Sequence, residues 1–162
     1  MAADRGKHQL HNREPLRIGA QTNGVPLVVA NNSSITPVFV ASVKEAAEAI
    51  AHAQPGDVIT FMPGIYRLRG PDMIASQPGT KTAGITVRAA HPGTVILELN
   101  AAEGFLVSAP YWTFENLTIR GVCKVQSYCE HAFHVTAKAM YFTAHNNTIL
   151  DFNAHFKING GG

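Results

Sequence analysis

One stretch of the sequence repeats in a way that restricts what the chain can fold into. Residues 105–119 read FLVSAPYWTFENLTI, and residues 133–149 read FHVTAKAMYFTAHNNTI. The pairs that lie 28 residues apart are Phe105/Phe133, Val107/Val135, Ser108/Thr136, Ala109/Ala137 and Phe114/Phe142; after a slip the pairs Asn116/Asn146, Thr118/Thr148 and Ile119/Ile149 lie 30 apart. Repetition at roughly 20–50 residues is typical of a solenoid, in which equivalent residues of successive turns stack. The repeat therefore predicts inward stacks at Phe105/Phe133 and Val107/Val135, and an amide ladder at Asn116/Asn146.

A single helical pattern precedes the repeat. Apolar residues recur at helical spacing in the stretch SVKEAAEAIAHA, which begins at Ser42. Ser42 and Glu45 form the S-x-x-E pattern of a capping box, in which each side chain satisfies a free backbone N–H of the first turn. Pro55 cannot continue a helix, and Gly56 tolerates the left-handed backbone conformation that follows a helix end. We therefore expect a helix from about Val43 to His52.

After Gly56 the pattern changes to short strands. The strand-like runs are residues 58–61, 65–67, 85–89, 95–99, 105–108, 112–114, 117–119, 133–136, 141–143, 148–150 and 156–158. They are rich in Val, Ile, Thr, Phe and Tyr, and Pro-Gly, Gly or Asn-Asn turns separate them. Asn-Gly and Asp-Gly hairpin signals do not occur between them, so simple antiparallel meanders gain no support. The alternative to a coil is an antiparallel sandwich with two similar hairpins.

The motifs after the helix resemble those of right-handed parallel β-helix proteins of the pectate-lyase-like superfamily, and among these the alginate lyase and chondroitinase B type of polysaccharide lyase. An A-x-PGD-x-I element occupies residues 53–59, a G-x-Y element residues 64–66, and an ITV-x-A-x-x-PG element residues 85–93. The resemblance covers roughly Val38 to Ile158. It implies an all-β fold, a right-handed parallel β-helix with an N-terminal capping α-helix. We expect residues 1–37 to be a polar lead-in with short strands, and residues 38–162 to hold the cap and the first rungs of a coil that is incomplete at its C-terminus.

The same resemblance implies a polysaccharide partner and β-elimination on uronate-containing glycans. The family's catalytic Lys and Arg, and its calcium-binding acids where present, lie on later rungs, and the stretch FNAHFKINGGG lacks their pattern. No catalytic residue and no calcium ligand set is therefore carried over. The rival interpretations are a non-catalytic carbohydrate-binding or surface module and an inactive truncated fragment.

The residues themselves suggest a candidate site. His134, His155 and Lys157 alternate with inward positions, so we expect one outward row that serves catalysis on an anionic glycan. The candidates for substrate binding are Glu130, His131 and Tyr111, with Tyr111 exposed and Trp112 in the core. The alternative is that solenoid faces carry His, Lys and Asn for solubility. A metal site from His131, His134 and Glu130 is disfavoured because a strand directs them to opposite faces.

Composition limits the remaining classes of function. The formal net charge of +2 comes without a basic run, which argues against nucleic acid as a partner, and no apolar stretch reaches the length of a membrane span. Cys123 and Cys129 fit either a local disulfide or two free thiols. The resemblance implies an extracellular or periplasmic location, although the polar N-terminal stretch has no signal-peptide core: the protein stays inside the cell, or this chain lacks its true beginning. If the chain is truncated, an uncapped coil end predicts edge-to-edge self-association.

Overall fold

The computed structural model describes residues 36–70 and 73–160, and these form a coil of short parallel strands. The elements are β1 (Thr36–Val40), α1 (Val43–Ala51), β2 (Asp57–Phe61), β3 (Gly64–Leu68), β4 (Met73–Ala75), β5 (Ile85–Ala89), β6 (Val95–Leu99), β7 (Glu103–Val107), β8 (Trp112–Glu115), β9 (Thr118–Gly121), the 3-10 helix η1 (Gln126–Tyr128), β10 (His131–Val135), β11 (Thr143–His145), β12 (Thr148–Leu150) and β13 (Ala154–Ile158). The expected lead-in, residues 1–37, lies outside the described residues except for the start of β1.

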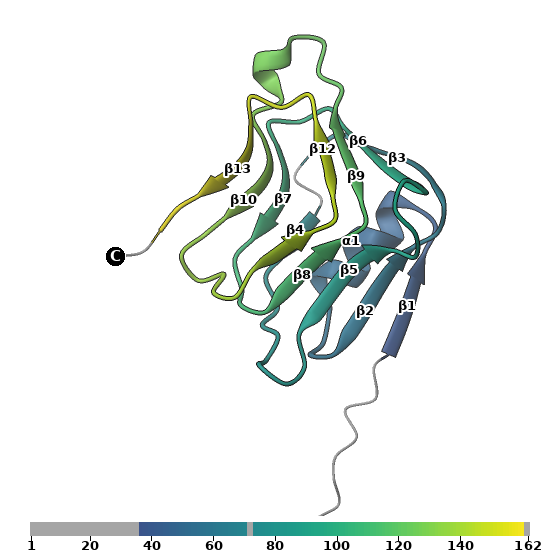
Figure 1. Ribbon diagram of the computed structural model, residues 1–162, viewed down its shortest axis with the longest axis vertical. Coiled ribbons are helices and arrows are strands. Elements are labelled where there is room, and N and C mark those ends of the chain that lie inside the picture. The colour runs from purple at the N-terminus through teal and green to yellow at the C-terminus, as the bar shows by residue number, and fades with distance from the viewer. Residues whose placement is uncertain (1–35, 71–72, 161–162) are drawn as a thin grey trace, which may run out of the picture. The chain divides into compact units, whose positions relative to one another are not determined.

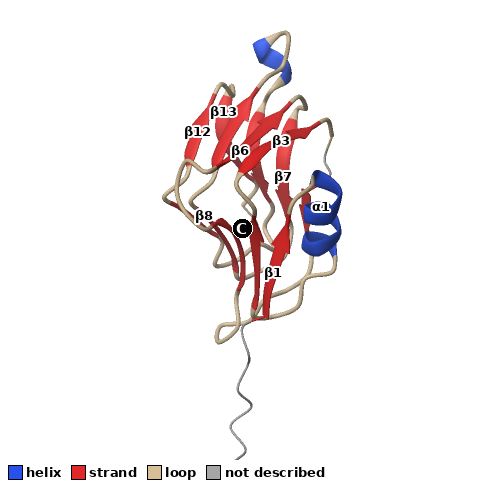
Figure 2. Cartoon of the chain, turned by 90° about the vertical axis from the view of Figure 1, so that its right-hand side faces the viewer, coloured by secondary structure: helices blue, strands red, loops and turns tan. Residues whose placement is uncertain are grey.

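Three parallel sheets are built by one strand each per turn of the chain. Sheet A has the order β1-β2-β5-β8-β11, sheet B β3-β6-β9-β12 and sheet C β4-β7-β10-β13. Every strand pair in these sheets is parallel, which excludes the antiparallel sandwich. Figures 1 and 2 show the resulting coil, in which each strand lies beside its counterpart from the previous turn. This arrangement confirms the expected right-handed parallel β-helix.

Helix α1 begins and ends close to the positions that the sequence predicts. Ser42 Oγ accepts a hydrogen bond from the backbone N–H of Glu45, and Glu45 Oε2 accepts one from the backbone N–H of Ala41. The reciprocal bond of the capping box therefore goes to the residue before the N-cap. Ala46 and Ile50 are fully buried, and α1 packs against β4 and the other strands of the first turn. The helix thus covers the N-terminal end of the coil, as expected of a cap.

The predicted stacks occur in the core. The rings of Phe105 and Phe133 lie 5.2 Å apart and nearly parallel, and Phe156 extends the stack at 5.4 Å from Phe133. Asn146 Nδ2 donates to Asn116 Oδ1, so the expected amide ladder is confirmed. Asn116 and Asn146 have positive φ angles of 62° and 53°, a conformation that asparagine tolerates better than most residues.

One part of the predicted alignment is wrong. Phe114 pairs in register with Ala144 and not with Phe142, because Thr113 already pairs with Thr143, 30 residues later. The two residues that lengthen the repeat from 28 to 30 therefore lie before β11, in the turn that follows β10. Phe142 still packs on Phe114, with ring centroids 5.9 Å apart.

The coil brings backbone so close at Gly104 that a side chain does not fit. A Cβ atom there would overlap the Leu99 side chain and lie 2.5 Å from the carbonyl oxygen of Ala132. We expect Gly104→Ala to lower the free energy of unfolding by about 1–3 kcal/mol, measured by urea denaturation. Gly160→Ala is the control, because no atom lies within 4 Å of a Cβ at Gly160. Equal losses for the two variants would contradict the packing argument.

Candidate functional site

Two of the predicted catalytic residues meet on the outer face of sheet C. His134 on β10 pairs in register with Lys157 on β13, and on its other side with Leu106 on β7. The side chains of His134 and Lys157 are 15% and 38% exposed, so both reach the surface from neighbouring strands. Because both strands belong to one continuous sheet, the spacing of the two side chains is fixed by the backbone ladder.

A carboxylate that the sequence reasoning missed joins these two residues. Glu103, the first residue of β7, places Oε2 2.9 Å from His134 Nδ1, and Oε1 accepts a hydrogen bond of 3.2 Å from Lys157 Nζ. Asn159 completes the group, with Nδ2 2.9 Å from His134 Nε2. We call these four residues the Glu103 cluster. Glu103 stands in register with His131, 28 residues later, so the repeat period itself could have placed it on this face.

The electrostatics of the cluster favour an ionised carboxylate. Partial burial acts to raise the pKa of Glu103, but the hydrogen bonds from His134 and Lys157 and their charges outweigh it. The net result is a lowered pKa for the Glu103 carboxyl group. The carboxylate therefore stays ionised and accepts hydrogen bonds through both oxygens.

This lowered pKa predicts a pH dependence of stability. The folded state binds the Glu103 proton more weakly than the unfolded state, so the contribution of Glu103 is fully present above the unfolded pKa, about 4.3. It is lost as the pH falls through the lower folded value. We expect Glu103→Gln to remove this part of the acid-induced loss, measured as the urea midpoint between neutral and acidic pH. The control is Glu98→Gln, since Glu98 pairs with Arg67 on sheet B; an unchanged acid profile in Glu103→Gln would contradict the assignment.

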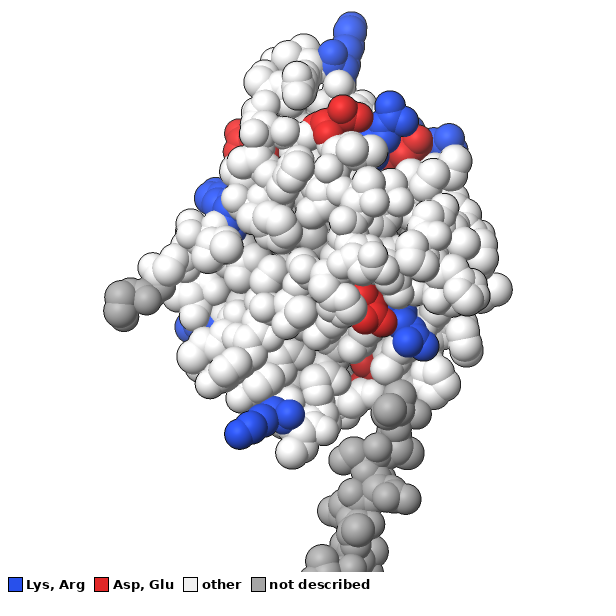
Figure 3. Space-filling view, viewed as in Figure 1, with Lys and Arg blue, Asp and Glu red and all other residues white. Residues whose placement is uncertain are grey.

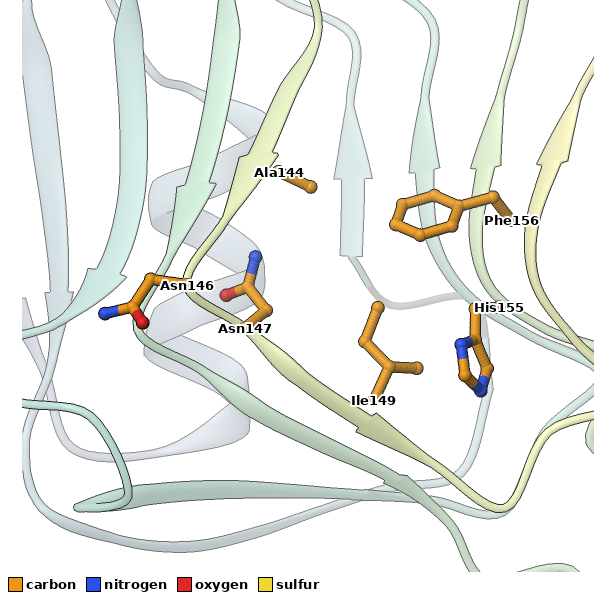
Figure 4. A pocket seen from close by; sticks show the side chains of 6 residues that line it. All are labelled: Ala144, Asn146, Asn147, Ile149, His155 and Phe156. Atoms are coloured by element: carbon orange, nitrogen blue, oxygen red, sulfur yellow. The ribbon is translucent and has the colours of Figure 1, made fainter.

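His155 does not join the predicted outward row. It lines an open hollow of about 380 Å³ at the last turn, together with Ala144, Asn146, Asn147, Ile149 and Phe156. Figure 4 shows His155 and Phe156 on one side of this hollow, with Ala144 and Ile149 facing them. The prediction assumed strict alternation, but on β10 two consecutive residues, Ala132 and Phe133, are both buried. Phe133 pairs with Phe156, so His155 takes the position equivalent to Ala132 and faces away from Lys157.

Glu130 and His131 lie beside the Glu103 cluster without joining it. The side chains of these two residues approach each other to 3.8 Å, between His131 Nδ1 and Glu130 Oε2, which is too far for a hydrogen bond. His131 Nδ1 is buried and has no hydrogen-bond partner. Across residues 36–70 and 73–160, no three His, Cys, Asp or Glu side chains converge to hold a metal ion.

The aromatic candidates lie at the corner that leads into sheet A. Trp112 is fully buried and donates from Nε1 to the carbonyl oxygen of Gln77 at 2.7 Å, as expected for a core residue. Tyr111 was predicted to be exposed but is half-buried, because Tyr141 stacks on it with ring centroids 4.6 Å apart. The more exposed ring is that of Tyr141, at 67%. A sugar-stacking surface at this corner would thus use Tyr141 before Tyr111.

Several charged side chains of the described residues form pairs between neighbouring turns of the coil. Arg67 pairs with Glu98, Arg120 with Asp151, and His145 with Glu115 at 2.8 Å. On the face seen in Figure 3, basic and acidic side chains are few and scattered over an otherwise uncharged surface. Of the two states left open for the cysteines, the structure has the disulfide Cys123–Cys129. None of the helices in the described ranges is long and apolar enough to cross a membrane.

Comparison with known proteins finds a similar coil among solved structures. No protein-family model matches the sequence, and no curated protein matches it significantly. Among solved structures, the PL6 family polysaccharide lyase Pedsa3628 from Pseudopedobacter saltans is similar over 71% of this chain, with 25% sequence identity and a TM-score of 0.57. The chain folds as a right-handed parallel β-helix of the PL6 polysaccharide lyase type.

The similarity covers only part of the PL6 lyases. This chain spans 25% of the length of the lyase from Pseudopedobacter saltans. The PL6 family alginate lyase AlyGC is a more distant match, with 14% identity over 70% of this chain and 19% of that chain, and a TM-score of 0.47. The coil of this chain has four turns, counted from β2 to β13 within the described residues.

Proposed function

We propose that this chain forms the N-terminal turns of an exported enzyme that cleaves uronate-containing polysaccharides by β-elimination. The observation that carries this proposal is the match to a PL6 polysaccharide lyase at 25% identity and a TM-score of 0.57. The disulfide supports export, because disulfides persist in oxidising compartments and are rare in the cytosol. A flat parallel sheet surface also suits an extended sugar chain, although fold alone does not define a reaction.

The Glu103 cluster contains groups suited to this chemistry. In the elimination, a base removes the proton at C5 of the uronate, the C5–H electron pair forms the C4=C5 double bond, and the C4–O bond breaks. The departing glycosidic oxygen keeps the electron pair of the broken C4–O bond and takes a proton from water. Lys157 is proposed to neutralise the uronate carboxylate, which acidifies the C5 proton. His134 is proposed to act as the base.

The test is an assay of the full-length protein on alginate and on uronate-containing glycosaminoglycans. Formation of the unsaturated product is followed by ultraviolet absorbance and confirmed by mass spectrometry. We expect His134→Gln to lower kcat by roughly 100-fold or more. His145→Gln is the matched control, because His145 forms a similar pair with Glu115 on sheet A, away from the cluster. Absence of unsaturated product from every uronate glycan would overturn the lyase proposal.

A second candidate function is non-catalytic glycan binding. It is favoured by the contacts of Glu103, whose carboxylate already binds both His134 and Lys157. The two side chains proposed as base and as cation are therefore already paired within the protein. A binding module would give a calorimetric signal with a uronate polysaccharide and no unsaturated product. Lys157→Ala would then weaken binding, whereas Lys44→Ala, on the exposed face of α1, would not.

A further inference from the structure

Asn159 is followed by a glycine at the point where the chain leaves sheet C. Strand β13 is the edge strand of this sheet, and Asn159 and Gly160 come directly after it (Figure 1). The side-chain carbonyl carbon of an asparagine can be attacked by the backbone nitrogen of the next residue. Glycine permits this attack best, because it has no side chain in the way and samples the widest range of backbone angles. A chemically labile pair therefore lies beside the Glu103 cluster.

The groups that would react are accessible. Asn159 and Gly160 are both exposed, and a Cβ atom placed on Gly160 would have no atom within 4 Å. Among the described residues, no backbone carbonyl accepts a hydrogen bond from the N–H of Gly160. The contact of Asn159 with His134 is made by Nδ2, which is the nitrogen that would leave. The carbonyl carbon of the Asn159 side chain is therefore open to the nitrogen of Gly160.

The other asparagines of the described residues lack this combination. Each of them is followed by a residue with a side chain. After Asn116 the next backbone N–H donates to a side chain 3.0 Å away, and after Asn147 and Asn153 it donates to a carbonyl oxygen 2.9 Å away. A nitrogen held in this way cannot turn toward the side chain that precedes it. Within the described ranges, Asn159 is therefore the asparagine best placed for this reaction.

We propose that Asn159 is a site of spontaneous deamidation, which converts the neutral amide beside His134 into a carboxylate. The nitrogen of Gly160 loses its proton to solvent and forms a bond to Cγ of Asn159, and the Cγ–Nδ2 bond breaks. Nδ2 keeps the electron pair of that bond, takes a proton from water and leaves as ammonia. Water then opens the cyclic succinimide at either carbonyl, which yields aspartate or isoaspartate at position 159.

This reaction changes the charge of the Glu103 cluster. The cluster has one carboxylate, which contacts His134 through Oε2 and Lys157 through Oε1. Because Asn159 Nδ2 lies 2.9 Å from His134 Nε2, aspartate at this position places a second carboxylate against the imidazole. Sheet C then carries an additional negative charge next to Lys157, and like charges repel. Deamidation should therefore weaken binding of an anionic glycan, a consequence that rests on the proposed function.

The test is peptide mapping by mass spectrometry of the full-length protein during incubation in mildly alkaline buffer. We expect the peptide with Asn159 to gain the mass of an amide-to-acid conversion and to divide into aspartate and isoaspartate forms. Fragmentation should show Asn116 and Asn153 unchanged over the same period. Mapping by peptide also separates this signal from that of Asn23, which precedes a glycine too and lies outside the described residues.

Gly160→Ala is the matched variant, because its added methyl group meets no atom within 4 Å in the folded protein. It should slow conversion of Asn159 by roughly 10-fold or more, since the methyl group restricts the backbone and hinders the attacking nitrogen. Urea unfolding shows that the variant is folded during the incubation. Conversion of Asn159 no faster than that of Asn153, or equally fast in Gly160→Ala, would overturn the proposal.

A binding measurement tests the consequence for the Glu103 cluster. Asn159→Asp introduces the carboxylate directly, and we expect it to raise the Kd for alginate by roughly 3-fold, measured by calorimetry. Gln54→Glu is the control, because it adds the same charge at an exposed position after α1 and should leave the Kd unchanged. An unchanged Kd in Asn159→Asp would refute the consequence. If the unmodified protein binds no uronate polysaccharide, the proposed function fails, and the deamidation is still decided by the peptide map.

Discussion

Replacing Phe133 with alanine is expected to lower the free energy of unfolding by about 3–5 kcal/mol. Phe133 is fully buried and lies at the centre of the aromatic core. Its ring stacks between Phe105 and Phe156, and its centroid lies 5.1 Å from that of Phe114 and 5.6 Å from that of Phe142. Removing the ring therefore leaves a cavity that touches strands of three successive turns.

The size of this loss depends on how little the surroundings can close. The neighbours of Phe133 are other large rings on strands fixed by parallel ladders, so they cannot move into the space without breaking register. In a solenoid each turn is stabilised mainly by its neighbours, so a defect in an inner turn weakens two interfaces. A cooperative loss at a single urea midpoint is expected, measured by circular dichroism and by Trp112 fluorescence together.

Phe156→Ala is the matched control for Phe133→Ala. It removes the same ring from the same stack, but at the last turn, where Phe156 is 39% exposed. Folding removes less apolar surface from water at that position. The loss of unfolding free energy should therefore be less than half of that for Phe133→Ala. Equal losses from the two variants would show that position in the stack does not set the energy.

Much of the fold could be predicted because the repeat and the register are the same physical fact. Stacking one turn on the next requires equivalent residues at a fixed spacing, and Phe105 with Phe133 meets that requirement in sequence and in structure. The wrong match of Phe114 with Phe142 came from placing the slip too late. Tyr111/Tyr141 and Thr113/Thr143, both 30 residues apart, already contained the correct register.

Strand parity and strand length limited the rest. His155 was expected outward because strands alternate, but sheet C has two consecutive buried positions in β7 and in β10, and alternation fails there. Strand β4 has three residues, too few for a periodic pattern. Glu103 was missed because it comes 54 residues before Lys157, and only the coil brings the two side chains together.

The disulfide gives the second large effect. Replacing Cys123 and Cys129 together with alanine is expected to lower the free energy of unfolding by about 2 kcal/mol, because the bond closes a short loop and restricts the unfolded chain. The loop joins β9 to β10, so the bond fixes the chain two residues before His131 at the start of β10. The loss should therefore be accompanied by faster amide hydrogen exchange in β10 than in β6.

Reduction of the unmodified protein provides an independent measurement of the same energy. A thiol reductant should lower its urea midpoint to that of the double alanine variant, and should leave the midpoint of that variant unchanged. Cys129 is fully buried, so opening of the bond must be verified by a thiol count before the midpoints are compared. If the thiols are free and the midpoint has not moved, packing alone holds the loop and the fold does not need the disulfide. The fold would then not require an oxidising compartment.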